Sequence, residues 1–131
     1  MSILPKKNNL GFFEIRLESI GGLGANLAGK MLAESGVLGL GLNGSNFSSY
    51  GSEKKGSPVK SFIRFCDEDV EIRDHSPIEE PHVVGVFHEA LYKTIDVISG
   101  LQPNGIVLVN TTRDFDEVAN DIRLKDGTLA I

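Results

Sequence analysis

The chain has 131 residues, 40% of them hydrophobic, which fits one folded domain with its own core. Its net charge of −5 at pH 7 argues against a nucleic-acid partner, because phosphate backbones are bound by basic surfaces. The single cysteine, Cys66, cannot by itself hold a metal or an iron–sulfur cluster. The sequence also has neither a bilayer-spanning apolar run nor a secretory signal. We therefore expect a cytoplasmic domain without a metal of its own.

The beginning of the chain predicts a strand followed by a helix. After a polar, flexible arm at residues 1–10, the stretch 12–20 has the apolar content and partial alternation of a strand. Residues 23–35 carry apolar side chains at three- and four-residue spacing, which indicates a helix. Gly36 follows where a C-cap glycine would stand, so we expect the helix to end there.

The middle of the chain predicts a long loop and an antiparallel hairpin. A weak strand is expected at 37–42, and residues 43–58 form a loop because they are rich in serine, glycine and asparagine. Residues 59–65 alternate clearly and predict a strand. The acidic run 67–69 then predicts a turn, and 70–73 a short returning strand that would complete the hairpin.

The last part of the chain alternates between strand and helix patterns. The expected elements are a strand at 83–87, a helix at 89–99, a strand at 106–109, a helix at 114–123 and a strand at 128–131. Strands that alternate with helices indicate crossover connections. The fold class is therefore α/β: an open, Rossmann-like, mainly parallel sheet with an antiparallel hairpin, flanked by helices, in one domain over residues 1–131.

The strongest local signal is the glycine turn Gly21-Gly22-Leu23-Gly24, which joins the first strand to the first helix. Such a turn leaves bare N–H groups at a helix start, and these can hold a phosphate, a carboxylate or another protein's backbone. A dinucleotide fingerprint would need glycine where the chain has Leu27, and an acidic residue near 40–43, where it has none. The motif alone therefore favours a tight turn over a nucleotide site.

The second signal is the polar stretch from Ser48 to Val59. It combines a phenol, a carboxylate, several hydroxyls and the cations Lys54 and Lys55. Loops at the carboxyl ends of strands face the ligand crevice in open α/β sheets, so the two lysines could meet a phosphate or an acidic partner. For an arbitrary protein a solvated turn is the simpler interpretation.

Together with the strand and turn Gly105–Asn110, these two segments resemble the gamma subunit of the 2-oxoacid:ferredoxin oxidoreductases, the pyruvate and related ketoacid enzymes. The resemblance runs from about Phe13 to Thr111. The family's turn usually reads G-x-G-G-Q-G and its loop S-Y-G-P-E-x-R-G-G. This chain differs in having Leu23 for the glutamine, Ser52 for the proline, Lys55 for the arginine and Ser57 for the second glycine.

The resemblance implies a gamma component of a multi-subunit enzyme. Such an assembly decarboxylates a 2-oxoacid oxidatively with coenzyme A, giving acyl-CoA, CO2 and reduced ferredoxin in anaerobic metabolism. The implied partners are alpha, beta and delta-type subunits, with ferredoxin as acceptor. Thiamine diphosphate, iron–sulfur clusters and CoA are expected in the assembled complex, and none on this chain alone. The isolated chain is expected to be inactive, and it ends at Ile131 earlier than the family's gamma domains, as a shortened version would.

We expect the glycine turn and the loop to face a ligand or the partner subunits, and no residue of the chain to be catalytic. The candidate residues are Gly21, Gly22, Leu23, Gly24, Ser49, Tyr50, Gly51, Glu53, Lys54, Lys55, Gly56 and Asn110. Two alternatives stay open. One is a free-standing domain that binds a nucleotide or phosphate ligand through the turn and the two lysines, and the other is a purely structural interface subunit.

Overall fold

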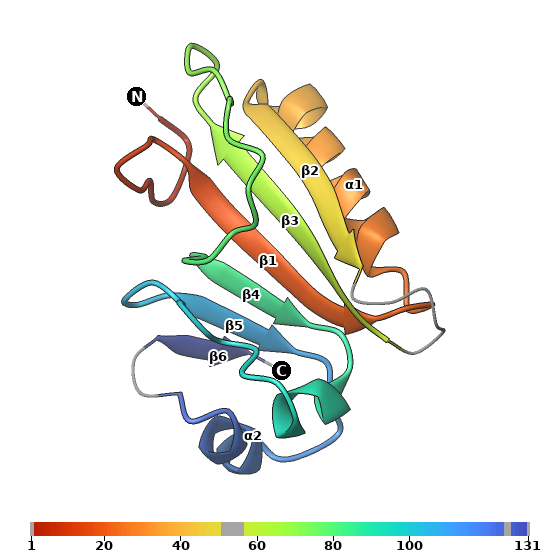
Figure 1. The fold of residues 1–131 in the computed structure, drawn as a ribbon. Helices are drawn as coiled ribbons and strands as arrows, with labels where there is room; N and C mark the ends of the chain where they lie inside the picture. Colours follow the sequence, from red (N-terminus) through yellow and green to blue (C-terminus); the bar gives the residue numbers. More distant parts are fainter. Residues whose placement is uncertain (1, 51–56, 125–126, 131) are drawn as a thin grey trace.

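The computed structural model describes residues 2–50, 57–124 and 127–130. Six strands form one sheet in the order β2-β3-β1-β4-β5-β6 (Figure 1). The strands are β1 Phe13–Ile20, β2 Asn43–Tyr50, β3 Pro58–Cys66, β4 Val83–Val86, β5 Ile106–Val109 and β6 Thr128–Ala130. The helices are α1 Ala25–Glu34, its π-helical continuation η1 Ser35–Gly39, the 3-10 helix η2 Glu89–Lys93 and α2 Phe115–Asp121. Within the described ranges, no helix combines the length and apolar character needed to cross a membrane.

Five of the six strands run in the same direction. β3 pairs antiparallel with both β1 and β2, whereas β1 with β4, β4 with β5, and β5 with β6 pair in parallel. β3 therefore runs alone against the others, and the carboxyl ends of the other five strands lie at one edge of the sheet. The predicted α/β class with an open, mainly parallel sheet is confirmed.

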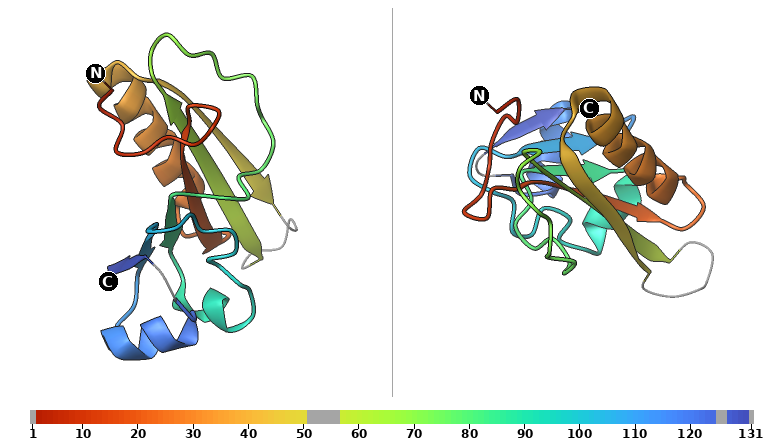
Figure 2. Two further views of the ribbon diagram at one scale, coloured as in Figure 1. Left: turned by 90° about the vertical axis from the view of Figure 1, so that its left-hand side faces the viewer. Right: turned by 90° about the horizontal axis from the view of Figure 1, so that it is seen from above.

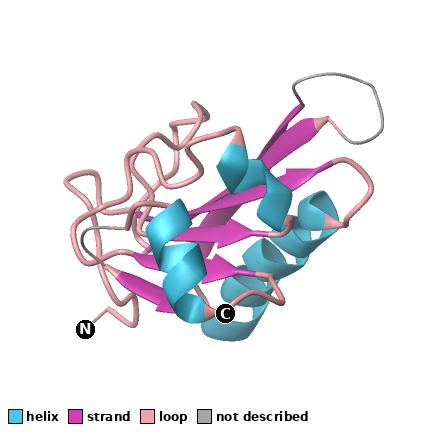
Figure 3. Ribbon diagram, turned by 90° about the horizontal axis from the view of Figure 1, so that it is seen from below, coloured by secondary structure: helices cyan, strands magenta, loops and turns pink. Residues whose placement is uncertain are grey.

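Helical and irregular layers cover the two faces of the sheet unequally. Helix α1 lies along one face, over β1, β2 and β3, and we call this the α1 face. The long connections between β3 and β5, with η2, lie on the opposite side (Figures 2 and 3), which we call the η2 face. Helix α2 adds the buried side chains of Val118 and Ile122 to the core of the η2 face.

Small residues let α1 approach the sheet closely. Its buried positions are Ala25, Gly29 and Ala33, at the four-residue spacing of one helix face. A Cβ atom at Gly29 would lie 2.0 Å from the Ser61 Oγ, so only glycine fits where α1 crosses β3. The side chains that hold α1 on the sheet are therefore small, and most of its large apolar side chains point elsewhere.

Several predicted elements match the structure closely. The strands expected at 59–65, 83–87 and 106–109 are β3, β4 and β5, and the helix expected at 114–123 is α2, which begins one residue after its cap position Asp114. The strand expected at 128–131 is β6. Among these, β5 has the predicted bounds without any shift.

The structure corrects the region after α1. Gly36 does not end the helix, because the chain continues through η1 and the Gly36 carbonyl accepts a hydrogen bond from the Leu42 N–H at 3.1 Å. Residues 37–42 form no strand, and the expected loop contains β2 instead. The strand prediction failed at β2 because serine and asparagine favour loops on their own. Here β3 supplies the backbone partners, and the Asn46 amide donates to the Ser61 hydroxyl at 3.0 Å.

Two further predictions are wrong. The turn after β3 is present, with the Val70 N–H donating to the Asp67 carbonyl at 2.9 Å, but residues 70–73 form no returning strand. The antiparallel hairpin is β2–β3 instead. The helix expected at 89–99 is reduced to η2, which ends at Lys93, and the carbonyls of Val97 and Ser99 accept hydrogen bonds from Arg16.

Candidate functional site

The site predicted from the sequence lies at the carboxyl edge of the sheet. β1, β2, β4 and β5 all end here, and β3 begins here (Figure 1). The glycine turn follows β1, and Asn110 follows β5. Segments that are far apart in the sequence therefore meet along one edge, as expected for an open α/β sheet.

The glycine turn is joined directly to the start of β3. The Gly21 N–H donates to the Ser57 carbonyl at 2.9 Å, so the turn and the end of the polar loop are neighbours. Gly22 and Gly24 have φ angles of 93° and 83°, which side-chain-bearing residues rarely adopt. Gly24 is the N-cap of α1 and has no side chain that could cap this helix. The N-terminus of α1 and the half-exposed Leu23 thus lie together at the edge.

Only part of the polar loop can be placed. Ser49 and Tyr50 form the end of β2, paired with Lys60 and Val59 of β3. The other predicted residues of this loop lie outside the described residues: Gly51, Glu53, Lys54, Lys55 and Gly56. The structure therefore brings the glycine turn, the end of β2 and the start of β3 to the same place.

Asn110 ties the neighbouring loops together. Its N–H donates to the Val86 carbonyl at 3.0 Å, and its side-chain amide donates to the Phe87 carbonyl at 3.3 Å. The Thr111 hydroxyl bonds the Glu89 carboxylate. These contacts fix the loops after β4 and β5 to each other, so Asn110 has a structural role besides its place at the edge.

Sequence reasoning missed a group of charges next to this edge. The Glu18 carboxylate is buried on β1, with one oxygen 2.9 Å from the Arg16 Nε and 3.3 Å from the Lys60 Nζ. Burial raises the pKa of Glu18, and the two cations oppose that rise. The visible signal was the alternation within β1, where Arg16 and Glu18 stand between apolar residues.

The cysteine and one of the histidines have surroundings that suit structural roles. Cys66 lies at the opposite edge, where burial and then the nearby Asp67 and Asp69 raise the pKa of its thiol, so it is a poor nucleophile. No group of three or more potential metal ligands occurs among the described side chains. His88 accepts a hydrogen bond from the Ala90 N–H at 3.1 Å and so caps η2.

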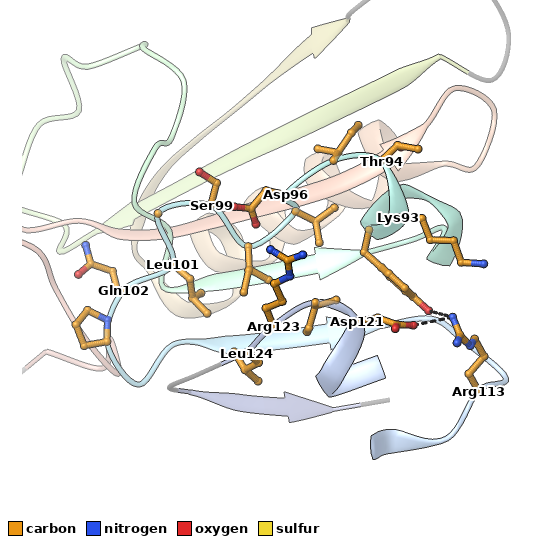
Figure 4. A pocket seen from close by; sticks show the side chains of 17 residues that line it. Lys93, Thr94, Asp96, Ser99, Leu101, Gln102, Arg113, Asp121, Arg123 and Leu124 are labelled. Atoms are coloured by element: carbon orange, nitrogen blue, oxygen red, sulfur yellow. Dashed lines mark hydrogen bonds and ion pairs between the residues drawn. The ribbon is translucent and has the colours of Figure 1, made fainter. Parts of the chain in front are cut away.

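A separate cavity of about 990 Å³ lies on the η2 face, between residues 92–103 and the end of α2 (Figure 4). Arg113 closes one side, with its guanidinium 2.9 Å from the Asp121 carboxylate and 2.8 Å from the Tyr92 hydroxyl. None of the described residues predicted for the site lines this cavity. This cavity and the predicted edge are therefore different places.

The fold and the edge define the class of protein. A family model described as pyruvate ferredoxin/flavodoxin oxidoreductase matches residues 14–129, nearly the whole chain. The chain belongs to this family, and the family predicted from the two motifs is confirmed.

Relatives with known names make this more specific. The chain is 39% identical over 118 residues to the "Pyruvate/ketoisovalerate oxidoreductases common subunit gamma" of Thermococcus kodakarensis, covering 90% of this chain and 62% of that one. It is 41% identical over 107 residues to "Pyruvate synthase subunit PorC" of Thermotoga maritima, covering 82% and 54%. The crystal structure of pyruvate oxidoreductase subunit PORC from Thermotoga maritima superposes with a TM-score of 0.76 at 34% identity, covering 92% of this chain and 62% of that chain. The chain thus spans about three-fifths of the length of such relatives.

Proposed function

We propose that this chain acts as the gamma component of a 2-oxoacid:ferredoxin oxidoreductase and uses the carboxyl edge of its sheet to contact the other subunits. The observation that carries the proposal is the meeting of the glycine turn with the start of β3, through the Gly21–Ser57 hydrogen bond. These are the same two segments that carry the family motifs. The similarity to subunits named gamma and PorC supports it.

The chemistry of the edge suits a contact better than a reaction. The N-terminus of α1 begins at a glycine and offers backbone hydrogen-bond donors, and Leu23 offers exposed apolar surface beside them. Backbone donors next to an apolar side chain match a protein surface with exposed carbonyls or carboxylates. The role assigned to this chain is therefore to shape and hold the assembly, while the reaction takes place on other subunits.

The cofactors of the reaction belong to those other subunits under this proposal. Iron–sulfur clusters need several cysteine thiolates, and the sequence has only Cys66. The residues present therefore do not fit such a cluster. Thiamine diphosphate, the clusters and CoA are expected in the assembled complex, and ferredoxin is the expected acceptor.

The test is to purify the tagged chain from its source cells, grown anaerobically, and to identify the co-purifying proteins by mass spectrometry. Recovery of a thiamine-diphosphate subunit and an iron–sulfur subunit is the expected result. Turnover of the purified assembly with pyruvate, 2-oxoglutarate and branched-chain oxoacids would then identify the substrate. If the chain is recovered alone and a phosphorylated ligand raises its melting temperature, the free-standing binding domain is the better reading.

A pair of leucine variants locates the contact. Leu23→Asp places a carboxylate in the glycine turn, and we expect it to reduce subunit recovery at least tenfold. Leu10→Asp changes a leucine that is also exposed but lies in the N-terminal arm, and it should leave recovery unchanged. Equal recovery with both variants would contradict the edge as the contact surface. Lys55→Ala then tests the loop: lower recovery with unchanged turnover per assembled complex indicates a purely structural role.

A further inference from the structure

The outer face of α1 carries large apolar side chains that are mostly exposed. Leu27 is 62% exposed, Met31 57% and, in the continuation η1, Leu38 83%. Leu27 and Met31 are four residues apart and lie on one side of α1, and Leu38 follows in the π-helical continuation. Figure 2 shows α1 lying outside the sheet, with no other helix or strand of the described part of the chain over it. We call these three residues the apolar stripe.

The stripe contributes nothing visible to the folding of the single chain. The opposite side of α1 already packs on the sheet through Ala25, Gly29 and Ala33. A contiguous exposed row of large apolar side chains is costly in water and marks a surface that another molecule covers. The question is which molecule fits it.

Two charged residues lie on the same helix at the margin of the stripe. Lys30 and Glu34 are both exposed, and neither forms an ion pair with any described residue. Their separation of four residues places them on one side of α1, one helical turn apart. They are therefore available to pair with charges on whatever covers the stripe.

We propose that the stripe pairs with the same stripe of a second copy of this chain, with the two α1 helices antiparallel about a twofold axis. Lys30 and Glu34 lie two positions to either side of Leu32. An antiparallel pair centred there brings Lys30 next to Glu34 of the partner subunit and Glu34 next to Lys30 of the partner subunit. A twofold contact uses the same patch on both copies, so a single helix sequence supplies both the cation and the carboxylate of each ion pair.

The apolar residues fit the same axis. Leu27 and Leu38 lie five and six positions from Leu32, so each faces the other residue's copy across the interface. Met31 lies beside the axis, where its flexible thioether side chain fills the centre. The apolar stripe and the charges thus select the same alignment independently, and this self-complementarity identifies the occupant.

The test is the oligomeric state of the purified chain by sedimentation equilibrium. We expect the wild type to dimerise. Lys30→Glu and Glu34→Lys should each weaken the dimer by about tenfold in dissociation constant, because each replaces two attractive contacts with two repulsive ones. An equimolar mixture of the two variants should dimerise again, since one copy then presents two carboxylates and the other two ammonium groups. The double variant, K30E with E34K, should also dimerise.

The controls address the apolar part of the contact. Leu27→Glu should abolish the dimer, whereas Leu10→Glu, at a leucine 63% exposed in the N-terminal arm, should not affect it. Both positions are exposed, so circular dichroism should report folded protein for both variants. A wild type that stays monomeric at every concentration overturns the proposal. So does a mixture of the two charge variants that stays monomeric, and so does a dimer that Leu27→Glu does not affect.

Discussion

The η2 face of the sheet has an apolar half and a charged half. Over β4, β5 and β6 the inward side chains are all apolar: Val84, Val86, Val107, Val109 and Leu129. Over β1 and β3 the corresponding positions include Glu14, Arg16, Glu18 and Arg64, all buried. Both halves lie under the same irregular layer between β3 and β5. Apolar packing holds this layer on one half, and hydrogen bonds to its backbone hold it on the other.

Arg16 shows why a charge can replace apolar packing here. Its guanidinium donates to the carbonyls of Ile78, Val97 and Ser99 at 3.2, 3.0 and 2.8 Å, and its Nε pairs with Glu18. A loop without regular structure has carbonyls with no ladder partners, and an arginine with five donors can satisfy several at once. The charged half thus lets an irregular segment be buried, which apolar side chains alone would not do.

The largest effect is expected from removing this arginine. Arg16→Ala should lower the free energy of unfolding by about 3–5 kcal/mol. It leaves the partly exposed Lys60 as the remaining ion-pair partner of Glu18, and it leaves three carbonyls without their hydrogen-bond donor. Urea denaturation measures the change. Arg16→Lys keeps the positive charge but loses the planar guanidinium with its several donors. Its free energy of unfolding should therefore lie between those of the wild type and Arg16→Ala. A loss below about 1 kcal/mol for Arg16→Ala would contradict the conclusion that the hydrogen bonds of Arg16 hold the irregular layer on the sheet.

The apolar half should respond through packing alone. Val107→Ala should cost about 2 kcal/mol of unfolding free energy, because Val107 is fully buried between β4 and β6. Leu108→Ala on the same strand is the matched control, since Leu108 points to the α1 face and is 48% exposed. It should change stability by less than about 0.5 kcal/mol. Equal losses at the two positions would mean that the two faces of β5 are not as different as described.

His82 lies where the two halves meet and should give the fold a pH dependence. It is buried, and its Nδ1 accepts a hydrogen bond from the Glu14 N–H at 3.0 Å. Burial lowers the pKa of His82, and the positive charge of Lys6 adds to that. Because the pKa of His82 is lower in the folded chain, the unfolded chain binds the proton at a higher pH than the folded chain does. Its contribution to stability is therefore present above about pH 6.5 and is lost as the pH falls from there through the folded pKa.

The variant His82→Asn isolates this contribution, because an asparagine oxygen can accept the same N–H. The wild type should lose up to about 1.4 kcal/mol per pH unit relative to the variant on acidification below pH 6.5. Burial raises the pKa of Glu14 and of Glu18, which acts in the opposite direction in both proteins and cancels in the difference. Urea denaturation at pH 7.5, 6 and 5 measures it. If the free energies of unfolding of the wild type and the variant change with pH in parallel, a contribution from the titration of His82 is ruled out.

The smallest effect is expected at the exposed end of the charged half. Lys60→Ala should cost roughly 0.2–1 kcal/mol, because the Lys60 side chain is 38% exposed and its ion pair with Glu18 is screened by water. Added salt should shrink the difference between wild type and variant. A loss as large as that of Arg16→Ala would show that exposure does not separate the two partners of Glu18.

The sequence predicted the parts of the fold in which local pattern and tertiary environment agree. β5 and β3 were found because their apolar or alternating runs match their burial. β2 was missed because its residues favour a loop, and only pairing with β3 makes them a strand. The helix expected at 89–99 was wrong: only η2 is helical there, and the carbonyls of Val97 and Ser99 accept hydrogen bonds from Arg16, which is distant in the sequence.

The candidate site divides in the same way. The glycine turn and Asn110 were identified from their motifs, and the structure places both at the carboxyl edge. The ion pair of Glu18 with Lys60 was missed because the alternation of each strand does not show that β1 and β3 are neighbours. Both faces of the sheet are covered here, so Glu18 is buried, whereas the Lys60 side chain is 38% exposed. Only the long-range topology reveals that.

The composition of β2 has a consequence for the behaviour of the protein in concentrated solution. β2 is an edge strand, and such strands can add a further strand from another molecule, which leads to aggregation. Apart from Phe47, which packs against Phe62 with ring centroids 4.9 Å apart, its residues from Asn43 to Ser49 are serine, asparagine and glycine. Such a sequence has little intrinsic tendency to extend a sheet. The serine-, asparagine- and glycine-rich composition that made this strand hard to predict from sequence also disfavours the addition of strands from other molecules at this edge.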